Sequence, residues 1–216
     1  MRVSPPPENE ATGFVLAGGR SSRMGRDKAL AQIAGRTLVA NALDLLREAG
    51  LAAAIAGARS ELADEAPIVS DEMPDLGPLG GICSALAATT AELALFMPVD
   101  TPFLPASLLE YLIRRARITG NAVSLVTVNG FTQTFPVVLR REVLPILQAE
   151  LLAGRRGCVL AFHAAAKTLA EPVRPVPVEL LAQAGHATHS RWLAPFQWFL
   201  NVNTLTELER ARSSIA

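Results

Sequence analysis

Short apolar runs alternate along the chain with longer segments in which apolar residues recur at helical spacing. Three such runs, at residues 14–17, 52–56 and 93–99, predict buried strands. Between the first two, the spacing predicts a helix from about Thr37 to Ala49, with apolar positions at Leu38, Ala42, Leu45 and Leu46. Strands that alternate with helices in this way are typical of an α/β domain with a mostly parallel sheet.

The rest of the chain continues this alternation. A third strand is expected at residues 67–69. The pair Asn129-Gly130 separates strands at 123–128 and about 134–139, which predicts a hairpin and antiparallel pairing at the end of the sheet. Prolines at 175 and 177 make residues 173–178 an edge strand. Further helices are expected at residues 60–65, 82–89, 105–117, 142–152, 158–166 and 205–212, the last capped by Thr204, and residues 183–198 show no clear period.

No interior linker or repeat divides the chain, so residues 12–216 form one predicted domain. Residues 1–11 contain three consecutive prolines and acidic residues without an apolar stretch, and we expect a disordered tail there. Apolar residues make up 50% of the chain, which indicates a packed core.

The charge balance and the cysteine count limit the expected partners and cellular compartment. Lysine plus arginine equals aspartate plus glutamate, 20 of each, which argues against nucleic acid or an acidic membrane as a partner. No apolar run reaches the roughly 20 residues that a membrane helix needs. Two cysteines, Cys83 and Cys158, are too few for a disulfide framework, so we expect both to be reduced and packed and the protein to be cytoplasmic.

The loop after the first strand, residues 18–28, combines glycines with fixed cations. Glycines allow backbone N–H groups to approach an anion closely, and Arg20, Arg23, Arg26 and Lys28 would repel one another unless an anion offset their charge. The loop is neither a Walker motif nor a dinucleotide fingerprint. A structural turn remains an alternative, but the cations favour a site for a nucleoside triphosphate.

Two aspartates follow predicted strands and would lie at the same sheet edge as this loop. Asp71 comes after the third strand and Asp100 after the apolar run at 93–99. Either residue can be a solvated turn aspartate, or a carboxylate at a ligand site. The basic turn Arg155-Arg156 is either an exposed turn or a phosphate contact.

Four segments, spread over most of the chain in the right order, together resemble the nucleotidyltransferases that mature the molybdenum cofactor, in particular their guanylyltransferase branch. The segments are Leu16-Ala17-Gly18-Gly19-x-Ser21-x-Arg23-Met24-Gly25-x-Asp27-Lys28, Asp71-x-x-Pro74-x-x-Gly77-Pro78-Leu79-Gly80-Gly81-Ile82, Asp100-Thr101-Pro102-Phe103 and Asn201-Val202-Asn203-Thr204.

The resemblance implies a Rossmann-like three-layer domain of the nucleotide-diphospho-sugar transferase type and a set of site residues. It implies Mg²⁺ on Asp100 and catalytic roles for Lys28, Arg23 and Asp100. The nucleotide contacts that it implies are Leu16, Ala17, Gly18, Gly19, Arg23, Lys28, Asp71 and Asp100. Contacts with the pterin substrate would come from Gly80, Gly81, Arg155, Arg156, Asn201 and Asn203, although the two asparagines can also be turn and capping residues.

The implied reaction is transfer of GMP from Mg-GTP to the phosphate of molybdopterin, with release of pyrophosphate. GTP and molybdopterin or molybdenum cofactor would be its partners, together with a molybdoenzyme maturation partner. Ala56 and Ala58 stand where the family has asparagine-bearing contacts with the nucleotide, so base specificity is left open. Cytidylyl transfer, transfer to a sugar phosphate, and a catalytically silent nucleotide-binding or pterin-binding relative are the alternatives.

Overall fold

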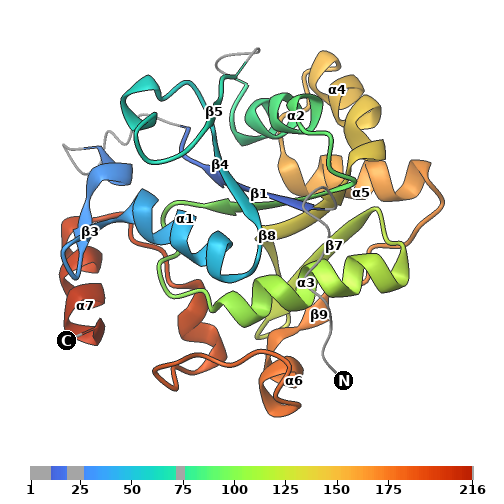
Figure 1. Cartoon of the computed structure of the whole chain (residues 1–216). Helices are drawn as coiled ribbons and strands as arrows, with labels where there is room; N and C mark the ends of the chain where they lie inside the picture. The colour runs from blue at the N-terminus through green and yellow to red at the C-terminus, as the bar shows by residue number, and fades with distance from the viewer. Residues whose placement is uncertain (1–10, 19–26, 72–75, 216) are drawn as a thin grey trace.

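The chain is built around a parallel sheet core (Figure 1). The computed structural model describes residues 11–18, 27–71 and 76–215, and within them the main sheet has seven strands in the order β5-β4-β1-β6-β8-β7-β9. Strand β1 (Ala11–Leu16) lies between β4 (Ala52–Ala56) and β6 (Leu93–Pro98), and β5 (Ile68–Val69) flanks β4. These four strands are parallel, as the continuous apolar runs predicted.

The other half of the sheet contains the predicted hairpin. Strands β7 (Val123–Val128) and β8 (Phe131–Arg140) pair antiparallel, and their turn places Asn129 at φ +49° and Gly130 at φ +79°. Strand β8 also pairs antiparallel with β6, so the antiparallel strand lies inside the sheet instead of at its edge. The edge position belongs to β9 (Val176–Pro177), which is parallel to β7. The predicted fold class is confirmed.

Helices cover both faces of the sheet and give a three-layer molecule (Figure 1). On one face pack α1 (Leu38–Glu48), α3 (Ala106–Thr119), α6 (Val178–Gln183) and α7 (Leu205–Ile215). On the other pack α2 (Pro78–Ala88), α4 (Leu144–Leu152) and α5 (Cys158–Thr168). A small hairpin, β2 (Gln32–Ile33) and β3 (Arg36–Thr37), and four 3₁₀ turns complete the described elements: η1 (Lys28–Leu30), η2 (Ser60–Leu62), η3 (Arg141–Val143) and η4 (Pro195–Phe199).

Several boundaries differ from the sequence prediction, among them the helix expected at residues 60–65, which is the shorter 3₁₀ turn η2. Ala11 belongs to β1 instead of the tail, because it pairs with Leu93. Helix α2 begins four residues earlier than predicted, since Pro78 fits its first turn and Gly77 precedes it at φ +70°. The predicted edge strand is shorter, and α6 follows it because residues 178 and 181 are buried on one helical face. Turn η4 lies in the segment that showed no period.

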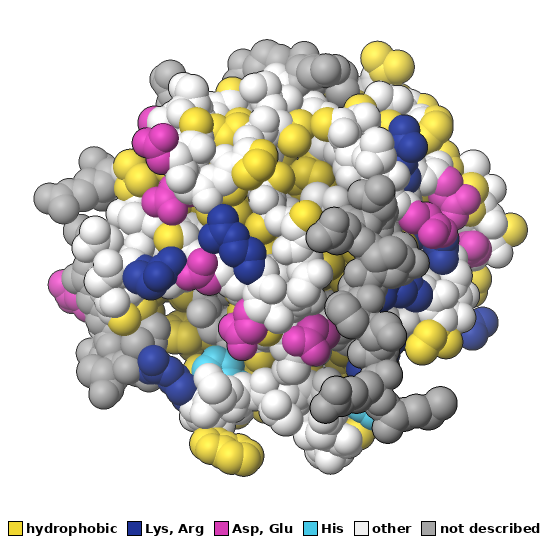
Figure 2. Space-filling model, viewed as in Figure 1, with side chains coloured by type: hydrophobic (Ala, Val, Ile, Leu, Met, Phe, Trp, Pro, Cys, Tyr) yellow, Lys and Arg dark blue, Asp and Glu magenta, His cyan; other side chains and the backbone are white. Residues whose placement is uncertain are grey.

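Both cysteines are free and buried, in agreement with the sequence. Burial raises the pKa of the Cys83 thiol to about 12 and that of Cys158 to about 11, so both stay protonated at neutral pH. Within the described residues, no helix is long and apolar enough to cross a membrane. On the face shown in Figure 2, described positive and negative side chains are intermixed.

Gly13 in β1 permits close contact between the sheet and α1. A Cβ atom at this position would lie 2.7 Å from one methyl group of Leu46, and Leu46 is fully buried. The substitution Gly13→Ala should therefore lower the free energy of unfolding by about 1–3 kcal/mol. Denaturant unfolding measures this change, and Gly81→Ala in α2 is the control because its added Cβ meets no atom within 4 Å. Equal stability of Gly13→Ala and wild type would contradict the packing argument.

Candidate active site

The carboxyl ends of the parallel strands meet at a pocket of about 440 Å³. Because β1, β4, β5 and β6 run in the same direction, the loops that follow them converge at one sheet edge. The pocket is lined from the ends of β1, β4 and β6, from the start of α2, and by Phe135 of β8. Among the described residues, three charged side chains reach it: Lys28, Asp71 and Asp100.

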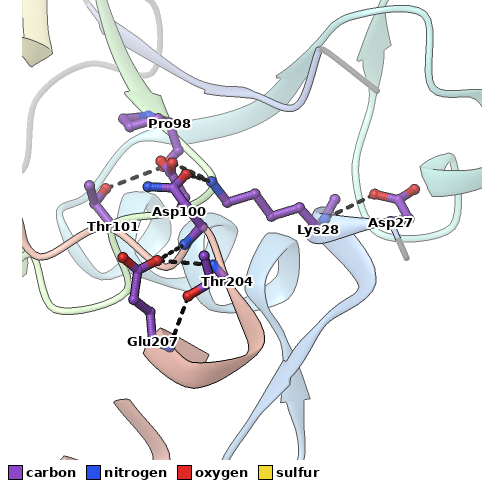
Figure 3. A network of polar contacts seen from close by, with 9 residues as sticks. Asp27, Lys28, Pro98, Asp100, Thr101, Thr204 and Glu207 are labelled. Atoms are coloured by element: carbon purple, nitrogen blue, oxygen red, sulfur yellow. Dashed lines mark hydrogen bonds and ion pairs between the residues drawn. The ribbon is translucent and has the colours of Figure 1, made fainter. Parts of the chain in front are cut away.

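Lys28 joins two other predicted site residues. Its Nζ lies 2.5 Å from Oδ2 of Asp100 and donates a hydrogen bond to Oδ1 of Asn203 at 2.5 Å. Figure 3 shows the Lys28 side chain extending from η1 to Asp100. The Lys28 and Asp100 side chains are only 16% and 18% exposed. This arrangement brings together three segments that are far apart in the sequence.

Backbone contacts hold the Asp100 segment in place. The N–H of Val202 donates to the carbonyl of Asp100 at 2.9 Å, which ties the segment before α7 to the end of β6. The Thr101 hydroxyl donates to the carbonyl of Pro98 at 3.3 Å and closes the turn after β6 (Figure 3). Asp100 therefore projects from a turn that is fixed on both sides.

Glu207 holds the Asn203 segment at the start of α7. Its Oε2 accepts the N–H groups of Asn203 at 2.7 Å and Thr204 at 2.9 Å, while its own N–H donates to the Thr204 hydroxyl at 3.2 Å (Figure 3). This reciprocal cap confirms the predicted capping by Thr204. The hydrogen bond from the Asn203 backbone, followed by those from Thr204, lowers the pKa of the Glu207 carboxyl.

The remaining pocket wall comes from glycines and apolar residues. Gly57 follows β4 at φ +139°, and a Cβ there would lie 3.3 Å from the N of Gly18. Sequence reasoning missed Gly57 and Phe135, although a glycine directly after a predicted strand is a signal for close backbone approach. Ala56, whose side chain is a methyl group, is among the residues that line the pocket, and Ala58 is exposed.

Most of the nucleotide contacts predicted in the described residues line the pocket. Leu16, Gly18 and Asp71 do so, and the Ser84 hydroxyl of α2 lies 3.3 Å from Oδ1 of Asp71. Ala17 does not: its N–H donates to the carbonyl of Ala56 at 3.3 Å and its side chain is buried. The predicted site residues Gly19 and Arg23 lie outside the described residues.

Of the residues predicted to contact the pterin substrate, some lie at the pocket and others do not. Gly81 lines the pocket, and Asn203 reaches it through Lys28. Gly80, Asn201, Arg155 and Arg156 are not among the residues that line it. Arg155 lies between α4 and α5 with a side chain 57% exposed, and it forms two hydrogen bonds with Glu150, at 2.5 and 2.6 Å.

These features together define a class of protein. A pocket at the carboxyl edge of a parallel sheet, with glycine backbone, a lysine and two carboxylates, is suited to a ligand that carries phosphate groups. The fold and the site are those of an α/β nucleotide-binding protein.

Comparison with known proteins narrows the class. Residues 13–168 match the family described as the MobA-like NTP transferase domain, and the chain belongs to this family. It is a nucleotidyltransferase. The chain is 41% identical over 151 residues to a molybdenum cofactor guanylyltransferase from Xanthomonas euvesicatoria pv. vesicatoria (strain 85-10), covering 67% of this chain and 74% of the relative. A protein of the same name from Serratia proteamaculans (strain 568) is 36% identical over 163 residues, covering 72% and 81%.

Solved structures share the fold at low sequence identity. Molybdopterin-guanine dinucleotide biosynthesis protein A from Archaeoglobus fulgidus has a TM-score of 0.73 at 20% identity, with 94% of this chain and 97% of that chain covered. The 2-C-methyl-D-erythritol 4-phosphate cytidylyltransferase from Thermus thermophilus has a TM-score of 0.62 at 15% identity, with 96% and 100% covered. Proteins named for different nucleotides thus have this fold, so the fold alone does not select the base.

The cap at Glu207 makes stability depend on pH. Because hydrogen bonds lower the pKa of Glu207 below its ordinary value of 4.5, its stabilising contribution is present above about pH 4.5 and is lost as the pH falls through the folded-state pKa. The substitution Glu207→Gln should therefore destabilise the protein at pH 7, and the difference from wild type should shrink below pH 4.5.

Denaturant unfolding between pH 3 and pH 7 tests this expectation. Glu48→Gln, at the exposed end of α1, is the control for the loss of one negative charge. A stability difference for Glu207→Gln that stayed constant over this pH range would contradict the role of the carboxylate.

Proposed function

We propose that this protein transfers GMP from GTP to the phosphate of molybdopterin or molybdenum cofactor, releasing pyrophosphate and forming the guanine dinucleotide cofactor. The observation that carries the proposal is the Lys28–Asp100 pair, held with Nζ and Oδ2 2.5 Å apart in the pocket of a nucleotidyltransferase. The named relatives support the choice of GTP and of the pterin acceptor.

The reaction requires that two anions be aligned, and it needs no general base. An oxygen of the acceptor phosphate, already negatively charged, attacks the α-phosphorus of GTP. A bond forms between them, and the bond from the α-phosphorus to the bridging oxygen breaks, so pyrophosphate leaves with the electron pair. Lys28, Arg23 and the N–H of Gly18 are the groups that we assign to the triphosphate, where they offset the repulsion between the phosphates.

Asp100 fits the role of a ligand to a divalent metal such as Mg²⁺. Magnesium is bound in such sites by one or two carboxylates together with substrate phosphates. The part of the chain that the structure describes contains no group of three metal-ligating side chains, so the nucleotide phosphates would complete the ligand set. A bound metal would neutralise negative charge on the reacting phosphates.

We propose that the nucleobase is recognised by the part of the pocket wall at the ends of β1 and β4. Leu16, Gly18, Ala56 and Gly57 line it, and none of them has a side-chain amide or hydroxyl. Backbone groups are then the polar partners for the base, together with Asp71. On the acceptor side, Gly81 and Asn203 are the proposed pterin contacts; Gly80, Asn201, Arg155 and Arg156 remain predictions from the sequence, and a maturation partner is likewise proposed.

Pyrophosphate release with each nucleotide tests the reaction. Purified protein with Mg²⁺ and molybdopterin should release pyrophosphate with GTP and much less with CTP, ATP or UTP. Release with CTP alone would overturn the guanylyl assignment in favour of cytidylyl transfer. Nucleotide binding without release from any of the four would favour a silent relative.

Asp100→Ala tests the metal and phosphate site. Loss of this carboxylate should reduce metal-dependent turnover by about a hundredfold or more, as loss of one electrostatic contact commonly does. The thermal unfolding midpoint shows whether the variant is folded. Asp44→Ala is the matched control, since Asp44 also forms an ion pair at 2.5 Å, in this case with Arg36, but lies on the exposed side of α1. Unchanged turnover in Asp100→Ala would remove Asp100 from the site.

A further inference from the structure

Arg59 connects two segments beside the pocket. It follows β4, and its side chain is 13% exposed although it is charged. Its Nη1 donates to the carbonyl of Ala17 at 2.8 Å, and its Nη2 forms an ion pair with Oδ2 of Asp27. Ala17 is the first residue after β1, and Asp27 is the residue before η1. One guanidinium group therefore joins the end of β1 to the start of η1.

The contact with Asp27 links Arg59 to η1, the turn that begins at Lys28. Oδ1 of Asp27 accepts the N–H of Ala29 at 3.0 Å and caps η1, whose first residue is Lys28 (Figure 3). The two carboxylate oxygens of Asp27 thus hold Arg59 on one side and the Lys28 turn on the other. Lys28 is held at its tip by Asp100 and Asn203, and the turn that contains it is capped by Asp27 through the N–H of Ala29.

We propose that Arg59 is a positioning residue that fixes the Lys28 turn relative to the carboxyl end of β1, so that the ammonium group meets the triphosphate. The proposal rests on the nucleotide function given above. Arg59 does not line the pocket, so it acts through Asp27 and Lys28 instead of through contact with the ligand.

The backbone of Arg59 is also fixed at this edge of the sheet. The N–H of Arg59 donates to the carbonyl of Gly57 at 3.0 Å, and the N–H of Gly57 donates to the carbonyl of Val69 at 3.0 Å. A Cβ atom at Gly57 would lie 3.3 Å from the N of Gly18, a tight contact, and the φ of +139° also disfavours a side chain there. Arg59 therefore extends from a rigid turn, which makes it an effective anchor.

The arrangement requires the planar fork of arginine. Nε donates to Oε1 of Glu61 at 2.6 Å, so three different nitrogen atoms of one planar group point at three partners. A lysine ammonium is a single point charge on a flexible stem and cannot meet the Ala17 carbonyl and Asp27 with the same fixed geometry. Lysine at this position should therefore keep the charge and lose most of the positioning.

The expected effect depends on the number of phosphates in the ligand. Misplacing Lys28 weakens contacts with the β- and γ-phosphates, which GTP has and GMP lacks. In Arg59→Ala, the Kd for GTP should rise about tenfold, the size expected for loss of a charge-assisted hydrogen bond. The Kd for GMP should change little, so the preference for GTP over GMP falls. Arg59→Lys should recover little of that preference.

Calorimetric titration of the full chain with GTP and with GMP, in the presence of Mg²⁺, measures both constants. Arg47→Ala is the matched control, because Arg47 also pairs with an aspartate, Asp44, and donates to a backbone carbonyl, that of Glu65, at 3.0 Å, but neither partner belongs to the Lys28 turn or to the pocket lining. Asp27→Asn tests the same path without changing Arg59. Its effect should not add to that of Arg59→Ala in the double variant, and it supplies the test if Arg59→Ala does not fold.

Three results would overturn the inference and leave the proposed function standing. Equal loss of affinity for GTP and GMP would indicate a general structural role, and unchanged affinity for GTP in both Arg59→Ala and Asp27→Asn would show that neither contact positions the site. Recovery of the full GTP preference by Arg59→Lys would show that charge alone is sufficient. Wild-type protein that binds neither nucleotide would overturn the proposed function, and with it this inference, whereas the other results leave that function standing.

Discussion

The ion pair between Lys28 and Asp100 is the interaction on which the site depends. Both groups are largely removed from water, and an unpaired charge in such a place is costly. Pairing requires that the turn after β1, the end of β6 and the segment before α7 meet at one point. The C-terminal part of the chain, beyond residues 13–168 that match the family, thus supplies Asn203 to the same site.

The parallel strands explain why this meeting point lies where it does. Each strand ends at the same sheet edge, and each contributes one kind of group: β1 leads to Gly18, β4 to Gly57, β5 to Asp71 and β6 to Asp100. A ligand at this edge therefore meets both glycine backbone and charged side chains. The antiparallel strand β8 adds the apolar residue Phe135 to the pocket lining.

Most of the fold and part of the site could be predicted from the sequence. Short apolar runs identified β1, β4 and β6, since strands buried on both faces leave a continuous pattern. The position of β8 inside the sheet depends on pairing between distant segments, and α6 is too short to show a clear period. Local patterns also gave no sign that Arg59 reaches Ala17 and Asp27, because that contact exists only after β1 and β4 have paired.

Base selection is a different physical problem from phosphate binding in this pocket. Phosphates are held by charge, and charge does not distinguish one nucleoside triphosphate from another. The base must be distinguished by shape and by hydrogen bonds, and here the wall after β4 offers the methyl group of Ala56 and the backbone of Gly57. Because Gly57 approaches Gly18 so closely, the width of the pocket at this point is set by backbone, which moves less than side chains do. Selectivity that depends on backbone positions requires that β1 and β4 keep their register. Base selectivity therefore depends on the same strand ends that Arg59 joins to the Lys28 turn.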